Sequence, residues 1–392
     1  MKPHSLFRIL FPVLSAMASM VVVATPSASA SLPASLEPFL GSPTFYSREL
    51  WSGETGGRST LVAFNGDVLV IKGGASSEYK RSSDAGLTWT TGDASGDAAR
   101  FSNAVLNEAN GHIFVMNAAN DRISRSTNHG VSWNASTSFR PTPDGFGNRP
   151  TSFSSHQAGI TLRFGPHAGR LLVPTRVQYG RIDPSLRGFN YSSAVYSDDG
   201  GVTWHTSHPI PIFGTGESAL VELSDERVIY NAREPMSLGN RFIATSYDGG
   251  VTWVEPYRDP VLPDGPRGTS YGCMGGLIRL PVDEYDILLY SNLDTYAGQL
   301  PSEIGATRTR DRENVTVWAS FDGGQTWPVH RRIFDGPSAY SNIGVGRAGT
   351  VTEGKIFLNY DGGPEGRNTA SHVAVFNLSW LLNGQSIHDF LD

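Results

Sequence analysis

Charged side chains at the ends of two apolar segments are the first candidates for chemistry in this chain. Glu217 directly precedes an apolar run that reads as a strand, and Arg233 directly follows Val228–Ala232, which reads as the next strand. A strand here would bury the carboxylate of Glu217, and a buried carboxylate is costly unless it has partners. Such a group is a candidate for acid–base catalysis. The alternatives are a solvated loop glutamate and a surface ion pair of Arg233 with Glu234 or Asp225.

A second group of candidates lies in the C-terminal third of the chain. Arg312 immediately precedes a strand pattern at 314–320, and Arg308 and Arg310 are close enough to compete with it. Tyr340 stands in a Ser-Ala-Tyr-Ser setting ahead of another apolar run. A lone tyrosine is more often a core or surface residue, and it is the sequence around Tyr340 that makes it a candidate. Guanidinium groups can bind a carboxylate through charge-assisted, partly bidentate hydrogen bonds.

These residues need a scaffold, and a repeated octet indicates which one. Its common form is Ser-x-Asp-x-Gly-x-Thr/Ser-Trp, with Asn128 in place of Asp in the second copy. The Asp side chain can accept hydrogen bonds from backbone amides, and glycine can take a positive φ. The octet therefore reads as a self-stabilising turn between strands, covered by its tryptophan. The copies span residues 82–89, 126–133, 197–204, 246–253 and 320–327.

The spacing of the octets predicts a closed ring of sheets. Two of the intervals match a propeller blade of ~40–50 residues. The two longer intervals leave room for inserted loops or for a blade whose turn has lost the motif. Residues 31–392 would supply six or more blades, and a strand at 373–382 would pair with N-terminal residues to close the ring.

Alternating apolar patterns between turn residues predict the individual strands. No long helical pattern is present, although a short turn is expected near Trp380. The strands are expected at 61–71, 112–117, 159–162, 170–174, 219–223, 227–232, 314–320 and 355–360.

The repeated turns resemble the Asp boxes of sialidases, and the resemblance extends to the candidate residues. In that family a Glu opens one strand and an Arg ends the next, which matches Glu217 and Arg233. An Arg before the last Asp box and a Tyr after it match Arg312 and Tyr340. A third family Arg matches Arg58, although this chain lacks the Arg-Ile-Pro signature there. The Asp boxes themselves are read as structural.

The resemblance implies a retaining glycosidase for terminal α-ketosidic sialic acids. Arg58, Arg233 and Arg312 would bind the carboxylate on the anomeric carbon of the sugar. Because that carboxylate would repel a carboxylate nucleophile, Tyr340 would attack instead, with Glu217 as its base. Sialidases are known exceptions of this kind among glycosidases. A glycosyl-tyrosine intermediate would then be hydrolysed with net retention.

The general acid of the family is missing from its expected place. Sialidases carry an Asp between the strand of the first Arg and the first Asp box, where this chain has a shortened segment at 72–80 without Asp. Glu78 is the carboxylate in that segment, and its alternative reading is an ordinary strand residue. Asp93 and Asp97 follow the first box and are further candidates. The strength of hydrolysis and the sugar preference depend on this missing residue.

The N-terminus reads as a secretion signal. Residues 1–30 carry Lys2 and Arg8, then an apolar run, then Ala-Ser-Ala at 28–30. We therefore expect cleavage after Ala30 and a secreted protein. No later segment is apolar enough to span a bilayer.

The composition of the chain argues against several classes of partner and cofactor. The 44 glycines and 24 prolines suit a turn-rich all-β protein, and 39% apolar content suffices for a large core. A net charge of −6 without a run of Lys or Arg argues against nucleic acid. The single Cys273 excludes an intrachain disulfide, and no His/Cys cluster has metal-ligand spacing. We expect neither a cofactor nor a metal.

The expected molecule is an all-β, six-bladed β-propeller with Asp-box turns, formed by residues 31–392 after a signal peptide at 1–30. We expect a secreted, monomeric exo-α-sialidase that acts on sialylated glycans, without nucleic-acid or membrane partners. One alternative is a glycosidase for a deaminated sialic acid or another ulosonic acid. The other is a propeller that binds an acidic sugar without cleaving it. Glu217 and Tyr340 favour an enzyme, since a binding protein needs neither, whereas the missing Asp favours the binding protein.

Overall fold

The computed structural model describes residues 31–73, 76, 78–93, 103–117, 121–135, 137–154, 156–181, 183–234, 239–264, 273–294 and 312–391. Contacts divide the chain into the units Met1–Ser31 and Leu32–Asp392, and every strand below belongs to the second. The expected signal at 1–30 and the candidates Arg308, Arg310 and Asp97 lie outside the described residues. Within the described part, no helix has the length and apolar character needed to cross a membrane.

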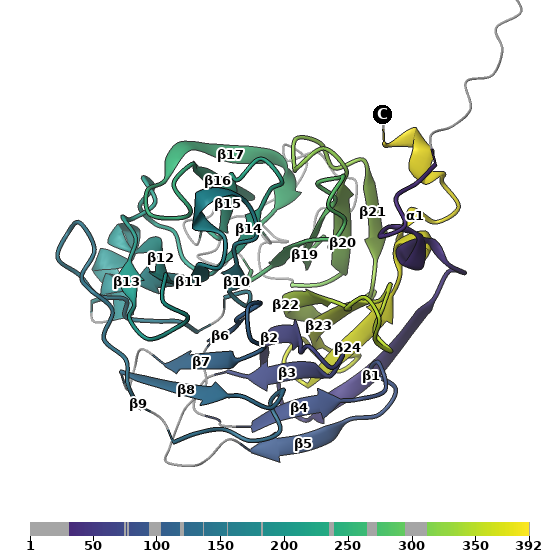
Figure 1. Ribbon diagram of the computed structural model, residues 1–392, viewed down its shortest axis with the longest axis horizontal. Helices are drawn as coiled ribbons and strands as arrows, with labels where there is room; N and C mark the ends of the chain where they lie inside the picture. The colour runs from purple at the N-terminus through teal and green to yellow at the C-terminus, as the bar shows by residue number, and fades with distance from the viewer. Residues whose placement is uncertain are drawn as a thin grey trace, which may run out of the picture. The chain divides into compact units, whose positions relative to one another are not determined.

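Six four-stranded antiparallel sheets are formed by the described residues of the second unit, and Figure 1 shows them arranged in a ring. The first sheet contains β2 (Gly57–Val62), β3 (Val68–Lys72), β4 (Glu78–Ser82) and β5 (Thr90–Asp93). The second contains β6 (Asn103–Leu106), β7 (Ile113–Asn117), β8 (Arg122–Ser126) and β9 (Thr137–Ser138). The third contains β10 (Ile160–Thr161), β11 (Leu171–Val177), β12 (Tyr191–Ser197) and β13 (His205–Thr206). The fourth sheet contains β14 (Ser218–Glu222), β15 (Val228–Ala232), β16 (Asn240–Ser246) and β17 (Val254–Pro263). The fifth contains β18 (Gly276–Arg279), β19 (Leu288–Leu293), β20 (Val315–Ser320) and β21 (Val329–Arg332).

The sixth sheet closes the ring by joining the two ends of the unit. It combines β22 (Ser338–Val345), β23 (Ile356–Gly362) and β24 (Ala370–Phe376) with the N-terminal strand β1 (Phe45–Ser52). β1 pairs antiparallel with β24, with Phe45 opposite Phe376. The predicted closure is therefore confirmed, and the fold is the six-bladed propeller expected from the sequence.

Two strand predictions were too long. The predicted strand at 373–382 ends at Phe376, because the side chain of Asn377 accepts a hydrogen bond from the backbone of Trp380 and caps the short helix α1 (Leu378–Leu382). The predicted strand at 61–71 is instead the hairpin of β2 and β3. The backbone NH of Gly66 donates to the carbonyl of Ala63, and Gly66 has φ +86°, so a tight turn interrupts the apolar pattern there.

The five Asp boxes connect the third and fourth strands of sheets one to five. In the box at 197–204, Asp199 accepts hydrogen bonds from the backbone NH and the hydroxyl of Thr203, at 2.9 and 2.6 Å. The sixth sheet has no box because its third strand is C-terminal and its fourth is N-terminal in the chain. The long intervals between boxes therefore hold inserted loops rather than a blade without the motif.

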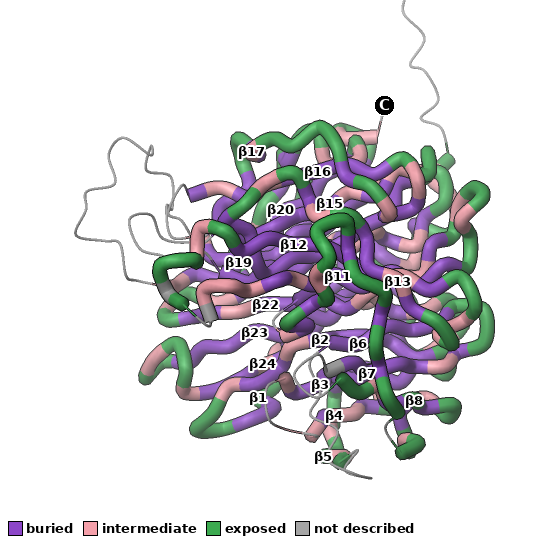
Figure 2. The backbone as a smooth tube through the Cα atoms, turned by 90° about the vertical axis from the view of Figure 1, so that its left-hand side faces the viewer, coloured by how far each residue is buried: buried purple, intermediate pink, exposed green. Residues whose placement is uncertain are grey.

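The core lies between the blades rather than in the middle of the ring. Buried apolar residues form six clusters in the described structure, and each cluster joins two neighbouring sheets. The tryptophan of each box packs into the cluster that its own sheet shares with the preceding sheet, so the box also seals an interface between blades. Figure 2 shows the result, with strands mainly buried and connections mainly exposed.

The first strands of the six sheets line the centre of the ring; these are β2, β6, β10, β14, β18 and β22. Most neighbours among them contact one another directly, and β14 contacts β11 of the third sheet. Their C-terminal ends meet at one side of the ring, where residues such as Val62, Glu222 and Val345 line a common cavity. Their N-terminal ends meet at the opposite side. Side chains at the starts of these strands can therefore converge, however far apart they lie in the sequence.

Candidate active site

Tyr340, Glu217 and Arg233 form one hydrogen-bonded cluster at the starts of the inner strands. The hydroxyl of Tyr340 donates to Oε1 of Glu217 at 2.8 Å. Nη1 of Arg233 is ion-paired with Oε2 of Glu217 and lies 3.4 Å from the Tyr340 oxygen. Glu217 is only 4% exposed, so it is the buried and partnered carboxylate that the sequence predicted. Arg233 is therefore paired with a buried carboxylate, whereas Asp225, one of its two surface alternatives, is paired with Arg227.

The other two predicted arginines flank the ring of Tyr340. The guanidinium carbon of Arg58 lies 4.9 Å from the centre of the ring, and that of Arg312 lies 5.4 Å from it. Arg58 is held by Asp361, whose Oδ2 is 2.8 Å from Nη1. All three arginines thus converge on one phenol. Asp361, which was not predicted from the sequence, is buried one residue before the end of β23.

Irregularities in two inner strands aim the side chains of Arg58 and Tyr340. The pairing of β2 with β3 shifts register between Gly57 and Ser59, and the pairing of β22 with β23 shifts between Ser338 and Ser341. Bulges of this kind reorient a side chain relative to the regular alternation of a strand. Both candidate residues lie within such a shift.

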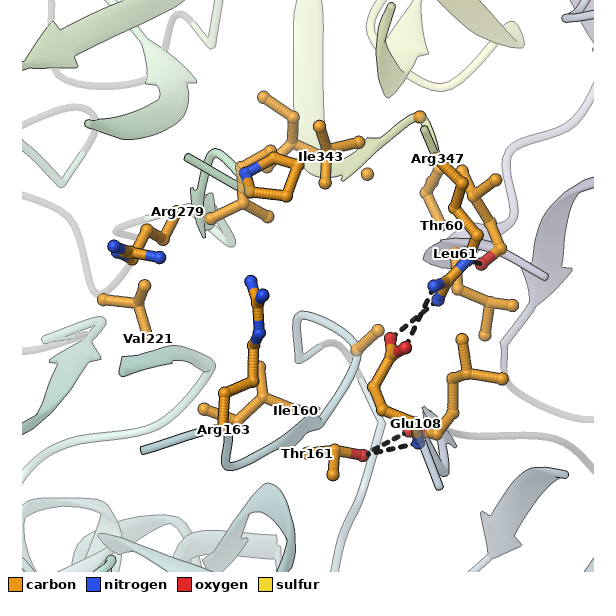
Figure 3. A pocket seen from close by; sticks show the side chains of 18 of the residues that line it. Thr60, Leu61, Glu108, Ile160, Thr161, Arg163, Val221, Arg279, Ile343 and Arg347 are labelled. Carbon is orange, nitrogen blue, oxygen red and sulfur yellow. Dashed lines mark hydrogen bonds and ion pairs between the residues drawn. The ribbon is translucent and has the colours of Figure 1, made fainter. Parts of the chain in front are cut away.

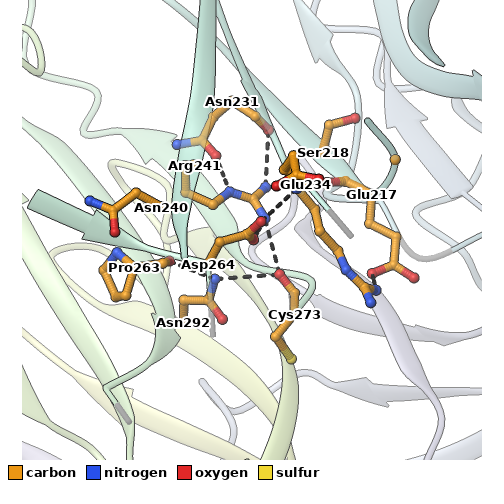
Figure 4. A network of polar contacts seen from close by, with 12 residues as sticks. Glu217, Ser218, Asn231, Glu234, Asn240, Arg241, Pro263, Asp264, Cys273 and Asn292 are labelled. Atoms are coloured by element: carbon orange, nitrogen blue, oxygen red, sulfur yellow. Dashed lines mark hydrogen bonds and ion pairs between the residues drawn. The ribbon is translucent and has the colours of Figure 1, made fainter. Parts of the chain in front are cut away.

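A buried arginine fixes the backbone of Glu217. Figure 4 shows Arg241, fully buried, with its guanidinium at the centre of a polar network. It is ion-paired with Asp264 at 2.7 Å and donates to the carbonyl of Glu217 at 3.2 Å. Its remaining hydrogen bonds go to the side chain and carbonyl of Asn231 and to the carbonyl of Cys273. The position of Glu217 is therefore set by the interior of the fourth sheet.

The electrostatics of the cluster keep Glu217 charged and Tyr340 neutral. Burial alone would raise the pKa of Glu217, but Arg233 and Arg176 outweigh it and lower the pKa to about 2. Burial and the charge of Glu217 raise the pKa of Tyr340, although Arg233 and Arg312 oppose this. At neutral pH the cluster therefore holds an anionic acceptor facing a protonated phenol, the arrangement required for a base that activates a nucleophile.

Arg176 is a fourth arginine in the cluster, and it was not predicted from the sequence. It lies in β11, and its Nη1 is 3.6 Å from Oε1 of Glu217, the oxygen that accepts the Tyr340 hydrogen bond. The available signal was a charged residue near the end of an otherwise apolar strand. That is the same signal that identified Arg233.

Glu78 lies apart from this cluster. It begins β4, two strands from β2 in the first sheet and so roughly 10 Å from it. It accepts a hydrogen bond from the indole of Trp51 and is ion-paired with Lys72 and Lys80, at 3.8 and 3.3 Å. Although burial raises the pKa of Glu78, Trp51 and the lysines lower it overall. Glu78 is thus held as an anion, which does not suit a proton donor.

The other described candidate for the acid is also distant. Asp93 ends β5, which pairs with β4 and is the outermost strand of the first sheet. It is exposed and lies three strands from β2, roughly 14 Å at the usual spacing.

A separate cavity of about 780 Å³ opens at the opposite end of the inner strands. Figure 3 shows Arg163, Arg279 and the bidentate pair of Arg347 with Glu108 around it. None of the candidate residues lines this cavity. Gln157 lines this cavity, and its side-chain amide exchanges two hydrogen bonds with the backbone of Ile343 across the ring.

No group of three or more His, Cys, Asp or Glu side chains that could hold a metal ion occurs within the described ranges.

Comparison with known sequences identifies relatives. The profile of the family described as BNR repeat-like domain matches residues 112–352. The chain is 33% identical over 273 residues to a sialidase of Micromonospora viridifaciens, an alignment that covers 68% of this chain and 36% of the relative. It is also 34% identical over 127 residues to sialidase-4 of Mus musculus, covering 31% of this chain and 24% of the relative. The chain thus spans about a third or less of the curated relatives named here.

Solved structures of low sequence identity share the fold. A microbial sialidase designated Hz136 superposes with a TM-score of 0.59 at 20% identity, covering 84% of this chain and 67% of the other. The intramolecular trans-sialidase of Ruminococcus gnavus superposes with a TM-score of 0.57 at 14% identity, covering 84% and 96%. At these identities the likeness supports the propeller architecture and nothing finer.

Proposed function

Because the chain belongs to the family of BNR repeat-like domains, we propose that it is an exo-α-sialidase that hydrolyses terminal α-ketosidic sialic acids with retention of configuration. The observation that carries this proposal is the convergence of three arginines and a glutamate on the single phenol of Tyr340. A protein that only bound an acidic sugar would need the arginines but not the Tyr340–Glu217 pair. Its substrates would be sialylated glycans.

Substrate binding would begin with the sugar carboxylate. Arg58, Arg233 and Arg312 surround the Tyr340 ring, so a carboxylate held between them would lie next to the phenol oxygen. Charge-assisted and partly bidentate hydrogen bonds of this kind are among the strongest hydrogen bonds in proteins. Asp361 keeps the guanidinium of Arg58 in place. The anomeric carbon, which carries the carboxylate, would then face Tyr340.

The chemical step follows from the Tyr340–Glu217 hydrogen bond. As the Tyr340 oxygen bonds to the anomeric carbon, its proton moves to Oε1 of Glu217, and the glycosidic bond breaks with its electron pair leaving on the aglycone oxygen. Water then attacks the anomeric carbon from the vacated side, and the proton that this water loses neutralises the released aglycone anion. Glu217 returns its proton to the departing phenolate, which restores the starting state. Two displacements give net retention.

A binding protein is the second candidate, and the state of Glu78 favours it. A sugar alkoxide leaves poorly unless an acid protonates it, and Glu78 is held as an anion by Trp51 and two lysines. General acid catalysis is worth ~10²–10⁴-fold. Loss of that factor would leave a slow enzyme on natural glycans, or a protein that binds without useful turnover.

The test is release of methylumbelliferone from its α-sialoside and from the deaminated analogue, because an activated phenol leaves without protonation. We expect release from the sialoside, and none from it with Tyr340→Phe. Faster release from the deaminated substrate would reassign the sugar to the related ulosonic acids. No release from either, together with measurable sialic acid binding, would leave the binding protein as the function.

We also propose that the protein is secreted after cleavage behind Ala30. This rests on the charged, apolar and Ala-Ser-Ala segments of residues 1–30. N-terminal sequencing of the protein from culture medium should begin at Ser31. A secreted chain that retains Met1 would refute the proposal.

A further inference from the structure

Arg176 lies in the active site, mostly but not fully buried, without the full set of partners that a structural arginine normally has. Its side chain is 13% exposed, and its ion pair with Glu217 is a long one, at 3.6 Å. Within the part of the chain that the structure describes, its buried Nε has no hydrogen-bond partner. A buried cation that is incompletely paired lowers stability. Folding alone therefore gives no reason for an arginine at this position.

Arg241 shows what a structural arginine looks like in the same region. It is completely buried, and its guanidinium makes five hydrogen bonds, one for each of its N–H donors, including the pair with Asp264. It reaches only the backbone of Glu217. Arg176, in contrast, faces the carboxylate of Glu217 itself, at the oxygen that would receive the Tyr340 proton.

The charges around Glu217 change when substrate binds, a step that rests on the proposed function. In the free protein Arg233 and Arg176 both face the carboxylate of Glu217. A substrate carboxylate at Arg233 would share the charge of that arginine and add a negative charge beside Glu217. Burial then favours protonation of Glu217, and a protonated Glu217 cannot accept the phenol proton. Arg176 is the cation that still faces Oε1.

We propose that Arg176 is a positioning residue that keeps Glu217 ionised, and aimed at Tyr340, while the substrate carboxylate occupies Arg233. It acts through Glu217 and takes no part in bond making itself. Glu217 is also within electrostatic reach of several other groups on neighbouring elements. These are Arg58 from β2, His156 from the segment before β10, Arg233 from the end of β15, Arg241 from β16, Cys273 from the segment before β18, and Tyr340 from β22.

The first test is the pH profile of methylumbelliferyl α-sialoside hydrolysis by Arg176→Met and Arg176→Lys. In Arg176→Met the acidic limb of the kcat profile should move to a pH about 1–3 units higher, because one adjacent opposite charge usually changes the pKa of a carboxyl group by that much. The limb of kcat/KM should move less, because it reports the free protein, in which Arg233 still faces Glu217. Lys should restore both limbs towards the parent values.

Arg279→Met is the matched control. Arg279 is also a buried arginine paired with a single carboxylate, Asp286, but it lies at the cavity on the opposite side of the ring. It should leave both limbs in place. A uniform loss of kcat in Arg176→Met without a shift of either limb would overturn the proposal, as would a rise of KM alone.

The second test needs no turnover and so separates this proposal from the proposed function. The folded pKa of Glu217, about 2, lies below the usual value of about 4.3. Its contribution to stability is therefore complete above the unfolded pKa and is lost as the pH falls towards 2. Removing Arg176 raises the folded pKa, so the melting temperature of Arg176→Met should fall less between pH 5 and pH 3 than that of the parent.

The double variant with Glu217→Gln completes the cycle. In that background there is no carboxylate to hold, so Arg176→Met should leave the slope of melting temperature against pH unchanged. If Arg176→Met and the parent, both with Glu217 intact, showed the same slope of melting temperature against pH, the role of Arg176 would be refuted. An equal change of slope in both backgrounds would refute it too, because Arg176 would then act on some other group. If the aryl sialoside is not hydrolysed at all, the proposed function fails and the melting cycle still decides on Arg176.

Discussion

Tyr340 donates a 2.8 Å hydrogen bond to Glu217, although 123 positions separate the two residues in the sequence. Glu217 precedes the inner strand of the fourth sheet, and Tyr340 lies in the inner strand of the sixth, with the fifth sheet between them. The bond thus bridges two sheets that are not neighbours. It forms because six blades bring the starts of their inner strands together at one side of the ring.

Replacing the nucleophile should abolish turnover and preserve binding. Tyr340→Phe keeps the ring between Arg58 and Arg312 but removes the oxygen that would attack. We expect hydrolysis of the aryl sialoside to fall by at least ~10³-fold, with sialic acid affinity in calorimetry changed little. Tyr46→Phe removes the hydroxyl that donates to the carbonyl of Ala85 in another part of the fold, and it should remain fully active. Full activity of Tyr340→Phe would rule out the assignment.

The arginine clamp predicts strict dependence on the sugar carboxylate. Arg58→Ala or Arg312→Ala should weaken sialic acid binding by ~2–5 kcal/mol, the cost of removing one partner of a desolvated charge pair. The methyl ester of sialic acid should bind the parent protein as weakly as the free acid binds these variants. Arg279→Ala, at the opposite end of the ring, should bind normally. Equal affinity for acid and ester would show that the arginines serve another purpose.

The environment of Glu78 predicts a protein that depends on a good leaving group. Because Lys72 and Lys80 hold this carboxylate as an anion, sialyl-lactose should be cleaved ~10²–10⁴-fold more slowly than the aryl sialoside. Glu78→Gln should change neither rate greatly. A variant that lost activity on sialyl-lactose but kept it on the aryl substrate would establish Glu78 as the acid after all.

The Asp boxes predict a stability that weakens in acid. Although burial raises the pKa of Asp199, hydrogen bonds from Thr203 lower it to about 2, below the ordinary value of about 3.9. The stabilisation is therefore present above pH 4 and disappears as the pH falls towards 2. Asp199→Asn should lower the melting temperature at pH 7, and the difference from the parent should shrink by pH 2.5.

Asn128 provides the control for this titration. It makes the corresponding hydrogen bonds to Ser126 and Ser132 in the second box without a charge. Asn128→Ala should therefore lower the melting temperature by an amount that does not depend on pH over this range. A difference between Asp199→Asn and the parent that stays constant from pH 7 to pH 2.5 would contradict the assigned role of the charge.

The repeated part of this molecule was readable from the sequence, because each Asp box is a local device. Asp199 bonds to Thr203 four residues later, so the motif carries its own structure wherever it occurs. There is one Asp box fewer than there are blades, because the sixth sheet is assembled from both ends of the unit. This depends on the whole chain and not on a local motif. Only the expectation of ring closure could anticipate that.

The site was partly readable. Glu217 and Arg233 stand at strand ends in a recognisable order, and Tyr340 follows the last box. Arg176 and Asp361 were missed because their partners come from other blades: Asp361 is 303 positions from Arg58, and their contacts depend on how the blades face each other. The register shifts that aim Arg58 and Tyr340 also leave no mark in the pattern of apolar residues.

The most direct test of the proposed mechanism is to trap the covalent intermediate with a fluorinated sialosyl donor and to locate the label by peptide mass spectrometry. The fluorine slows breakdown of the glycosyl intermediate, so the attacked residue stays modified. If Tyr340 is the nucleophile, we expect a single sialosyl adduct on Tyr340 that is absent from Tyr340→Phe. An adduct on Glu217 or on any other residue, or turnover of the aryl sialoside without any adduct, would contradict it.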